Sequence, residues 1–372
     1  MVSFYPTKDK AQTMSDNHHR YSSIRKALKQ MYPEAKGQAA KALGTLAGMI
    51  SGIVGSKSTN YGAMASKTPD QTKLESRVKR ISRWVNKSGE EATLEVLPFA
   101  QDLLAGLAEQ TIVLVMDGSE VGRKCVTLMV SVVYHGRALP IAWLVVKGSK
   151  GHRPESEHIQ LAKKVQELVP RGADVVFLGD GEFDGSELQA TLAKFGWVYV
   201  CRTASNTIFN VEGDEVSFQS LSLHPGEQIN LPEALFTRQK YGPIHAIAWW
   251  RKGYCEPIYL VTNLELMEEA CYWYAKRFRI ETFFSDQKSR GFNLHKSHLA
   301  VPSRICRLMI ASCLAYVWLV FLGTLARKTG LDKTIHRSDR CDLSLFQLGF
   351  RLLDHFLNLG QSIPVAFIPT LD

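Results

Sequence analysis

Four residues of the segment YAKRFRIETFFSDQK have types and a spacing that suit phosphate chemistry. They stand at relative positions 0, 3, 7 and 14 and are Tyr274, Arg277, Glu281 and Lys288. At about 100° per residue, an α-helix would gather them into a stripe roughly 60° wide. The glutamate could hold a metal ion while the cations bind phosphates on either side and the tyrosine adds a hydroxyl or a ring face. A solvated helix face with i,i+4 ion pairs would show the same stripe, so the pattern needs support from other residues.

Two aspartates upstream each follow an apolar, β-branched run. Asp117 comes near the end of TIVLVMDG, and Asp180 ends ADVVFLGD. In open α/β sheets, ligands and catalytic groups collect at strand ends, because the strand fixes the residue while its side chain faces a crevice. Both aspartates are therefore site candidates, although an acidic residue after a buried strand can also be a turn former. Glu182 and Asp184 follow closely in LGDGEFDG, and only the closeness of Asp180 to the strand favours it over them.

The elements that would hold these aspartates begin near Thr111. Apolar runs predict strands over residues 111–118, 125–134, 138–146, 173–180 and 197–203, and helices over residues 157–168 and 186–195. The tripeptide at residues 135–137 has the length of a hairpin turn. This order of elements predicts an α/β sheet that carries both aspartates at strand ends.

The texture of the sequence changes after this sheet. Between residues 206 and 266, short β-like pieces alternate with turn residues, namely EVSFQSL, HAIAWWRKG and PIYLVTN. This pattern predicts an inserted antiparallel sheet. From Met267 the chain becomes helical, and a last amphipathic helix near residues 343–359 could pack on the body or on a second subunit.

Positive charge is concentrated in the first hundred residues. The chain has a formal net charge of +9, and residues 1–100 carry 16 Lys and Arg against 8 Asp and Glu. The rest of the chain is nearly neutral, with 29 against 28. Lys and Arg gain affinity for a polyanion by displacing counterions from its phosphates. The segment therefore fits a polyanionic partner, and an ordinary solvated surface is equally compatible with the charge alone.

Residues 20–90 resemble a series of helices broken by Gly- and Ser-rich joints, such as residues 52–62. The stretch KLESRVKRISRWVNK at residues 73–87 spaces its apolar side chains by four, three and four residues. It predicts an amphipathic basic helix, which could lie against phosphates or simply on a core. The residues of this helix that we select as candidate DNA contacts are Arg77, Arg80 and Arg83.

A polar loop after the third strand holds a looser cluster of acids and bases. Its members are His152, Arg153, Glu155, Glu157 and His158. In a loop with Gly, Ser and Pro, such a set is more often a solvated turn than a metal or acid/base site. The position of the loop beside the sheet would also suit a DNA-facing role for Lys147, Lys150 and Arg153.

Other features indicate a cytoplasmic protein. The seven cysteines form no CxxC pair, which is typical of reduced thiols and gives no sign of structural zinc. No secretory signal is evident at the N-terminus. Residues 308–326 form an uncharged stretch long enough to span a bilayer, but its polar residues and its isolation favour a buried helix. We therefore expect no membrane partner.

Together with the two aspartates, the four-residue stripe resembles a known family. The pattern Y-x2-R-x3-E-x6-K is the signature of one branch of the bacterial insertion-sequence DDE transposases, and all four positions match. The resemblance covers about residues 111–322, including FNLHKSHL after the signature. The first ninety residues match only in general character, as a helical DNA-binding region.

The resemblance implies an RNase H-like mixed-sheet core, interrupted by a β-rich insertion and preceded by a helical DNA-binding region. The corresponding division of the chain is a basic helical region at 1–95, the first part of the core at 105–205, the insertion at 206–266, the second part of the core at 267–330 and a helical C-terminal region at 331–372. The order of predicted elements agrees with this division.

Carried over residue by residue, the resemblance makes Asp117, Asp180 and Glu281 the catalytic, metal-binding triad. Tyr274, Arg277 and Lys288 would contact DNA near the cut. Some relatives stack a tryptophan of the insertion on a flipped base. Trp249 and Trp250 are candidates for this role, and a core or aromatic surface role is equally compatible with them.

Three carboxylates suit the implied reaction. Two Mg²⁺ ions, about 3.5–4 Å apart, could activate water or a 3′-hydroxyl and stabilise the leaving oxygen of a phosphodiester. Mg²⁺ prefers carboxylate oxygen, and Mn²⁺ could substitute for it. The implied partners are the terminal inverted repeats of a mobile element and a target DNA, bridged by a homodimer.

Two other functions remain open. One is a metal-dependent nuclease on the same core, without strand transfer. The other is a domesticated DNA-binding protein that keeps the fold and has lost the chemistry, which the intact triad and the complete signature argue against. We see no GxxxxGK[ST] motif, so ATP is not implied.

Overall fold

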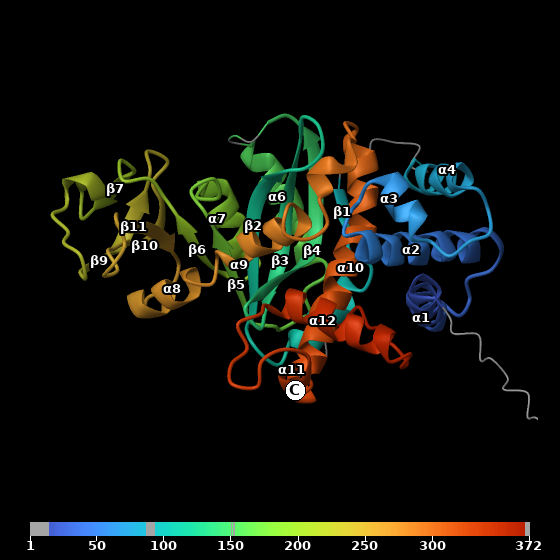
Figure 1. Ribbon diagram of the computed structural model, residues 1–372. Coiled ribbons are helices and arrows are strands. Elements are labelled where there is room, and N and C mark those ends of the chain that lie inside the picture. The colour runs from blue at the N-terminus through green and yellow to red at the C-terminus, as the bar shows by residue number, and fades with distance from the viewer. Residues whose placement is uncertain (1–14, 87–93, 150, 152, 369–372) are drawn as a thin grey trace, which may run out of the picture.

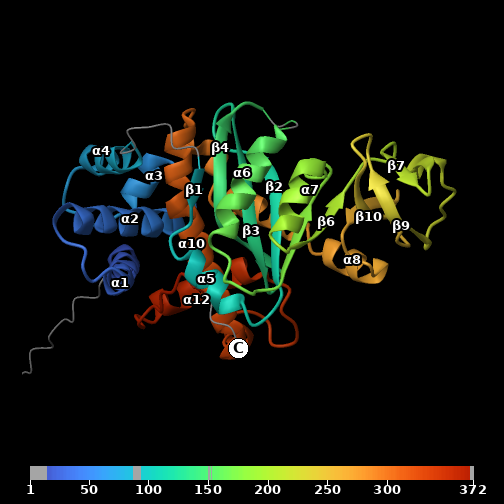
Figure 2. The same ribbon diagram turned by 180° about the vertical axis from the view of Figure 1, so that it is seen from behind.

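The structure is a computed structural model that describes residues 15–86, 94–149, 151 and 153–368. A helical N-terminal part, a central sheet covered by helices and a β-rich edge follow one another across the molecule, as Figures 1 and 2 show from opposite sides. The protein is thus a mixed α/β structure, as the sequence predicts.

Within the described residues, one sheet of eleven strands runs through the molecule. Its spatial order is β1 (Leu94–Val96), β4 (Arg137–Lys147), β3 (Cys125–Tyr134), β2 (Ile112–Glu120), β5 (Val175–Gly179), β6 (Val198–Arg202), β11 (Ile258–Thr262), β10 (Tyr241–Trp249), β9 (Gln228–Phe236), β7 (Ile208–Val211) and β8 (Asp214–Ser217). The pairs β2–β5 and β5–β6 are parallel, and the other described pairs are antiparallel.

The five predicted core strands are all present. Strands β3 and β4 meet in a two-residue turn, since Tyr134 pairs with Arg137. His135 and Gly136 both have positive φ, which is the geometry that matches the twist of a tight hairpin. Strand β1 and the strands β7 and β9 were not predicted, because most residues of these segments are half-buried or exposed and the segments show weak periodicity.

The β-rich segment differs from the prediction in one respect. It is antiparallel, as expected, but it is not a sheet of its own. Strand β11 pairs with β6 over Leu260–Arg202, Val261–Cys201 and Thr262–Val200, so the core sheet continues into the segment. The sequence pattern shows which residues form strands, but it does not show which strand pairs with the core edge.

Helices cover both faces of the core sheet. Their bounds are α1 (Asp16–Met31), α2 (Gly37–Ser56), α3 (Tyr61–Ser66), α4 (Leu74–Val85), α5 (Ala100–Leu107), α6 (Glu155–Gln166), α7 (Ser186–Lys194), α8 (Met267–Tyr274), α9 (Arg279–Gln287), α10 (Pro302–Lys328), α11 (Asp332–Ile335) and α12 (Leu345–Asn358). Helices α9 and α10 lie on one face and α6 and α7 on the other (Figures 1 and 2).

The expected joint at residues 52–62 is mostly helical. Helix α2 continues through Gly52 to Ser56, and the break is confined to residues 57–60. Gly52 is required for a close contact, because a Cβ there would lie 2.6 Å from the carbonyl oxygen of Met64. Glycine at this position thus serves packing between α2 and α3, and it does not end the helix.

The long apolar segment forms α10, a helix at the centre of the molecule. Helices α2 and α10 are both long and apolar enough to cross a membrane, but 89% of the apolar window of α10 is buried inside the protein. Helices α10 and α12 also touch backbone to backbone, because a Cβ on Gly349 would lie 1.9 Å from the carbonyl oxygen of Leu319. This packing agrees with the predicted buried helix.

Helix α9 is anchored to the core by a buried ion pair. Asp286 binds the guanidinium of Arg137, which also donates a hydrogen bond of 3.2 Å to the hydroxyl of Tyr316. The ring of Phe283 contacts that of Tyr316 at a centroid distance of 5.0 Å. These contacts fix α9 against β4 and α10, and they set which of its side chains face the end of β2.

Candidate active site

The structure brings Asp117 and Asp180 together at neighbouring parallel strands. Val115 of β2 pairs with Leu178 of β5, and each aspartate lies two residues further along the chain, on the same face of the sheet. Asp117 is buried, and its Oδ1 accepts a hydrogen bond from the backbone N–H of Gly118 at 2.7 Å. The Oδ1 of Asp180 accepts one from the N–H of Glu182 at 3.0 Å.

The third carboxylate, Glu281, lies in the first turn of α9. The sequence predicted one helix through the stripe, but the helix is interrupted. Helix α8 ends at Tyr274 and α9 begins at Arg279. Tighter turns join them, with hydrogen bonds from the N–H of Arg277 to the carbonyl of Tyr274 and from Glu281 to Phe278. These i→i+3 bonds overwind the chain, and the stripe still brings Arg277 to Glu281.

The guanidinium of Arg277 stands between all three carboxylates. Its Nη1 lies 3.6 Å from Oδ2 of Asp117 and 3.7 Å from Oδ2 of Asp180, and its Nη2 donates a hydrogen bond to Oε1 of Glu281. Nη1 is buried and, in the described part of the chain, has no hydrogen-bond partner. The triad is therefore assembled around a cation that belongs to the chain itself.

Burial and charge act in opposite directions on the groups of this site. Burial alone lowers the pKa of Arg277, but the nearby Tyr274 and the three carboxylates outweigh it and raise that pKa above its ordinary value. Burial raises the pKa of Tyr274 to about 12. Arg277 is therefore charged and Tyr274 neutral at physiological pH. Since Tyr274 is only 7% exposed, little of its ring is available to DNA.

The carboxylates line a cavity of about 380 Å³. Lys288, at the C-terminal end of α9, reaches into it and donates a hydrogen bond of 2.7 Å to the hydroxyl of Ser119. Sequence reasoning missed Ser119, although its place two residues after Asp117 in β2 turns it to the same face of the sheet. All four residues of the stripe are thus near the two aspartates, three of them lining the cavity.

The neighbouring acids have other contacts. The Oδ2 of Asp184 accepts a hydrogen bond of 2.6 Å from the hydroxyl of Thr203, at the end of β6. The Oε1 of Glu182 accepts one of 2.9 Å from the backbone N–H of Arg153. Asp180 lies 3.7 Å from Nη1 of Arg277, and this contact favours it as the second aspartate of the site.

The acid and base cluster of the polar loop has a structural role. Arg153 pairs with Glu157 at 2.7 Å, and Glu155 accepts a hydrogen bond from the N–H of Leu188, at the start of α7. His158 is buried against the ring of Phe183. Lys150 and His152 of the predicted set lie outside the described residues. Arg153 and His158 also meet at Glu182, whose Oε1 accepts the backbone N–H of Arg153 and lies 3.6 Å from Nε2 of His158. The described members thus tie the loop to α6, to α7 and to the segment after β5.

Mg²⁺ would find suitable ligands at the triad, because all three side chains are hard carboxylate oxygens. Within the described ranges, no three His, Cys, Asp or Glu side chains stand close enough together to hold a metal ion. The three carboxylates instead converge on the guanidinium of Arg277. The donor set therefore fits a divalent cation in type, and the position between the carboxylates already suits a positive charge.

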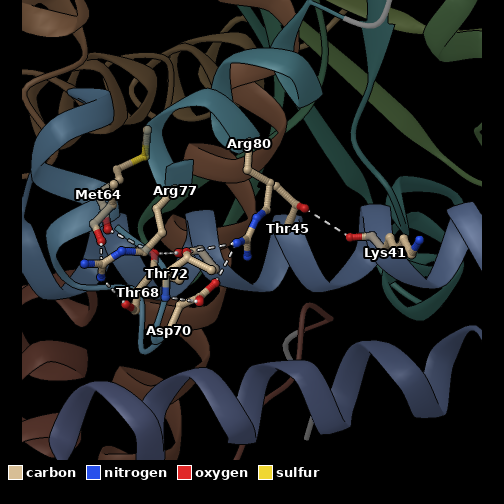
Figure 3. A network of polar contacts seen from close by, with 10 residues as sticks. Lys41, Thr45, Met64, Thr68, Asp70, Thr72, Arg77 and Arg80 are labelled. Atoms are coloured by element: carbon tan, nitrogen blue, oxygen red, sulfur yellow. Dashed lines mark hydrogen bonds and ion pairs between the residues drawn. The ribbon is translucent and has the colours of Figure 1, made fainter. Parts of the chain in front are cut away.

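The arginines of α4 differ from one another in their contacts, and Figure 3 shows those of Arg77 and Arg80. Arg77 donates hydrogen bonds to the carbonyls of Ala65 and Thr68 at 3.0 and 2.8 Å. Arg80 pairs with Asp70 at 2.6 Å. Arg83 makes no hydrogen bond or ion pair with any other described residue. Arg77 thus braces the helical region from inside, and Arg83 remains open to a partner.

A cavity of about 640 Å³ lies between α1, α2 and α4. Its cationic lining residues are Arg25, Lys41, Arg80 and Arg83, and none of its lining residues is acidic. Arg80 and Arg83 therefore face the same hollow, whereas Arg77 does not line it. This hollow is the part of the N-terminal region that suits a phosphate group best.

Neither tryptophan of the β-rich segment lines the carboxylate cavity. Trp249 is half-buried at the end of β10 and packs against the core. Trp250 donates a hydrogen bond from its indole nitrogen to the carbonyl of Tyr254 at 2.9 Å. Both have an evident role within the β-rich segment.

A comparison with protein families identifies the family of the chain. The sequence profile of the family described as transposase DDE domain matches residues 109–318. No curated protein matches the sequence. Among solved structures, the chain is similar to a piggyBac transposase in a cryo-EM synaptic complex with hairpin DNA, with 10% identity, a TM-score of 0.44, and coverage of 93% of this chain and 80% of that one. Because the profile spans more than half of the chain and both aspartates and Glu281, the chain belongs to the transposase DDE domain family.

Proposed function

We propose that the protein carries out cut-and-paste transposition, cleaving DNA at the ends of a mobile element and joining the freed ends to a target. The observation that carries the proposal is the convergence of Asp117, Asp180 and Glu281 on one cation position. Phosphodiester cleavage needs such a position, because negative charge develops on the leaving oxygen.

In this proposal, the three carboxylates hold two divalent ions, Mg²⁺ or in its place Mn²⁺. When bound, the ions supply an activated water or 3′-hydroxyl and stabilise the leaving oxygen. Lys288 binds a phosphate beside the cut, and Ser119 holds its ammonium group in place. Arg277 binds a second phosphate, and Tyr274, buried behind it, supports the turn that presents it.

The finer assignments are part of the proposal. The complete Y-x2-R-x3-E-x6-K pattern supports the corresponding branch of bacterial insertion-sequence transposases. Three antiparallel strands followed by two parallel ones support an RNase H-like core. The basic hollow between α1, α2 and α4 supports binding of the terminal inverted repeats. We further propose a homodimer on DNA and a cytoplasmic, nucleoid-associated location without a membrane partner.

The test begins with the DNA that flanks the coding sequence, where short inverted repeats would identify the substrate. Labelled end fragments are then incubated with the purified chain and Mg²⁺ or EDTA. We expect Mg²⁺-dependent cleavage that is abolished in Asp180→Asn and retained in Asp184→Asn, a matched control four residues away. Cleavage by Asp180→Asn would remove that residue from the proposed site.

A second DNA in the same reaction separates transposition from the alternatives. A transposase joins the labelled ends to the added plasmid, whereas a nuclease only releases fragments. A domesticated binding protein would shift the end fragments in a gel and leave them uncut. Joined products that vanish with Asp117→Asn would establish the proposed function.

A further inference from the structure

Arg277 is bound in a way that is unusual for a DNA-contacting side chain. Its side chain is only 15% exposed, and it faces three carboxylates with a single positive charge. Its Nη1 is buried at 3.6 and 3.7 Å from two aspartates, which is too far for a hydrogen bond to either. The guanidinium is therefore held by one hydrogen bond, from Nη2 to Glu281, and by charge alone toward the two aspartates, neither of which makes a close, directional contact with it.

A divalent ion would use the same carboxylate oxygens. Asp117 and Asp180 present to Arg277 the Oδ2 atoms whose partner Oδ1 atoms accept backbone hydrogen bonds. A metal ion needs these Oδ2 atoms at coordinating distance, roughly 2.0–2.1 Å for Mg²⁺. The guanidinium stands between them, so metal and Arg277 cannot occupy the position at the same time.

The chain provides space for the guanidinium to move. On the side of Arg277 toward β6 and β11 lies a second cavity of about 480 Å³. Asp180 and Arg277 line both this cavity and the carboxylate cavity, and Arg202 and Tyr259 line only the second. Arg277 thus forms part of the wall between two open spaces, and a change of rotamer can move its charge from one to the other.

We propose that Arg277 is the resident counter-ion of the empty triad and that divalent metal binds as the guanidinium leaves. The inference rests on the proposed function, since it takes the triad to be the metal site. DNA supplies the new partner for the displaced charge, because a phosphate forms a bidentate, charge-assisted pair with arginine. The arrangement couples metal binding to DNA binding. In the metal-free protein, the charge of Arg277 offsets the repulsion among the three carboxylates.

The test is a titration of the full, DNA-free chain with Mn²⁺, followed by electron paramagnetic resonance of the free ion. We expect Arg277→Gln to bind Mn²⁺ about tenfold more tightly than the native chain, because the competing cation is gone. Arg277→Lys keeps a charge on a more compact group and should fall in between. Arg202→Gln removes one charge from the neighbouring cavity and should change the affinity by no more than about twofold.

The Mn²⁺ dependence of the melting temperature gives a second readout, which the loss of a merely structural arginine would not change. In EDTA, Arg277→Gln should melt below the native chain, because the carboxylates then repel one another. Mn²⁺ should raise the melting temperature of this variant more than that of the native chain, since it replaces the lost charge. A lower melting temperature that Mn²⁺ does not restore would overturn the inference, as would equal Mn²⁺ affinities.

Adding Asp117→Asn to Arg277→Gln separates the test of the role of Arg277 from the test of the triad as the metal site. If Mn²⁺ binding is lost in the double variant but was never stronger in Arg277→Gln, only the role of Arg277 is refuted. If Mn²⁺ binds the double variant as well as the single one, the triad is not the metal site and the proposed function fails with it. Should Arg277→Gln not fold, Arg277→Lys decides the question through the same two measurements.

Discussion

Helix α9 carries two carboxylates that meet arginines, one on each side. Asp286 faces the core and pairs with Arg137, and their side chains are only 9% and 10% exposed. Glu281 faces the cavity, is 56% exposed and shares Arg277 with two aspartates. The first site has one negative charge for one positive charge, with Tyr316 completing it. The second has three negative charges around Arg277, with Lys288 as a further positive charge in the same cavity, and it opens to solvent.

The difference in charge balance and exposure distinguishes a structural ion pair from a site that can bind a cation. Buried charges are tolerated when each has its partner, and the Asp286 pair meets that condition. The triad does not, because three carboxylates exceed the charge of the guanidinium among them. An excess of negative charge at an open cavity attracts further cations.

The largest expected effect is on catalysis, and it comes from substitutions of the three carboxylates at the cavity. Asp117→Asn, Asp180→Asn and Glu281→Gln should each lower the rate of Mg²⁺-dependent end cleavage by about 10³-fold or more, equivalent to ~4 kcal/mol of barrier. The three variants should unfold at the same urea concentration as the native chain or a higher one, since each relieves repulsion. Loss of folding in step with activity would place the triad with the structural pairs.

On the core-facing side of α9, a substitution in the Asp286–Arg137 pair should lower stability. Asp286→Ala leaves Arg137 buried without its counter-charge, so the free energy of unfolding should fall by about 3–5 kcal/mol. Urea denaturation followed by tryptophan fluorescence measures this loss. Adding Arg137→Met to the variant should recover a large part of it, because no unpaired charge then remains. A stable Asp286→Ala protein would contradict the contrast between the two sides.

The buried Asp286–Arg137 pair should make the stability of the protein depend on pH. Burial raises the pKa of Asp286 to about 6, above the ordinary 3.8, and Arg137 and Arg290 offset burial only in part. A raised folded-state pKa contributes stability that is complete below the unfolded pKa and is lost as the pH rises through the folded one. The unfolding free energy should therefore fall between pH 4 and pH 6 by up to ~3 kcal/mol. Asp286→Asn is the reference, and a constant difference between the two chains across this range would refute the assignment.

The smallest effect is expected in α4, where the same contrast applies to arginines. Arg83→Ala should weaken binding to the element ends and lower the salt slope of log K by about 1, because one phosphate contact is lost. Arg77→Ala should leave the slope unchanged and lower stability, since two carbonyls lose their donor. Fluorescence anisotropy between low and moderate salt measures both. Equal slopes for the two variants would show that internal contacts do not separate them.

Much of the site could be predicted from sequence because its signals are local. Asp180 directly follows the buried strand β5, as predicted, whereas Asp117 lies inside β2, which continues to Glu120, so its expected place at a strand end was wrong. The two aspartates still meet where the parallel register of β2 and β5 places them. The spacing of the stripe predicted that Arg277 and Glu281 share a face. It still does so across the interruption at residues 275–278, because tighter turns there change the rotation only slightly.

What could not be predicted depends on contacts between distant residues. The pattern of α4 treats Arg77 and Arg83 alike, and only the carbonyls of Ala65 and Thr68 distinguish them. The same holds for Arg137, whose place at the start of β4 gives no sign of its partner Asp286, 149 residues away. The choice of Asp180 over Asp184 likewise needs the hydrogen bond from Thr203.

The continuity of the sheet across β6 and β11 has a mechanical consequence. Backbone hydrogen bonds at Leu260, Val261 and Thr262 join the β-rich edge to the strand next to the one that ends at Asp180. A tilt of that edge as a separate lobe would have to break this ladder. A force on the β-rich edge therefore changes the twist of the whole sheet, including the strands β5 and β2 that position Asp180 and Asp117.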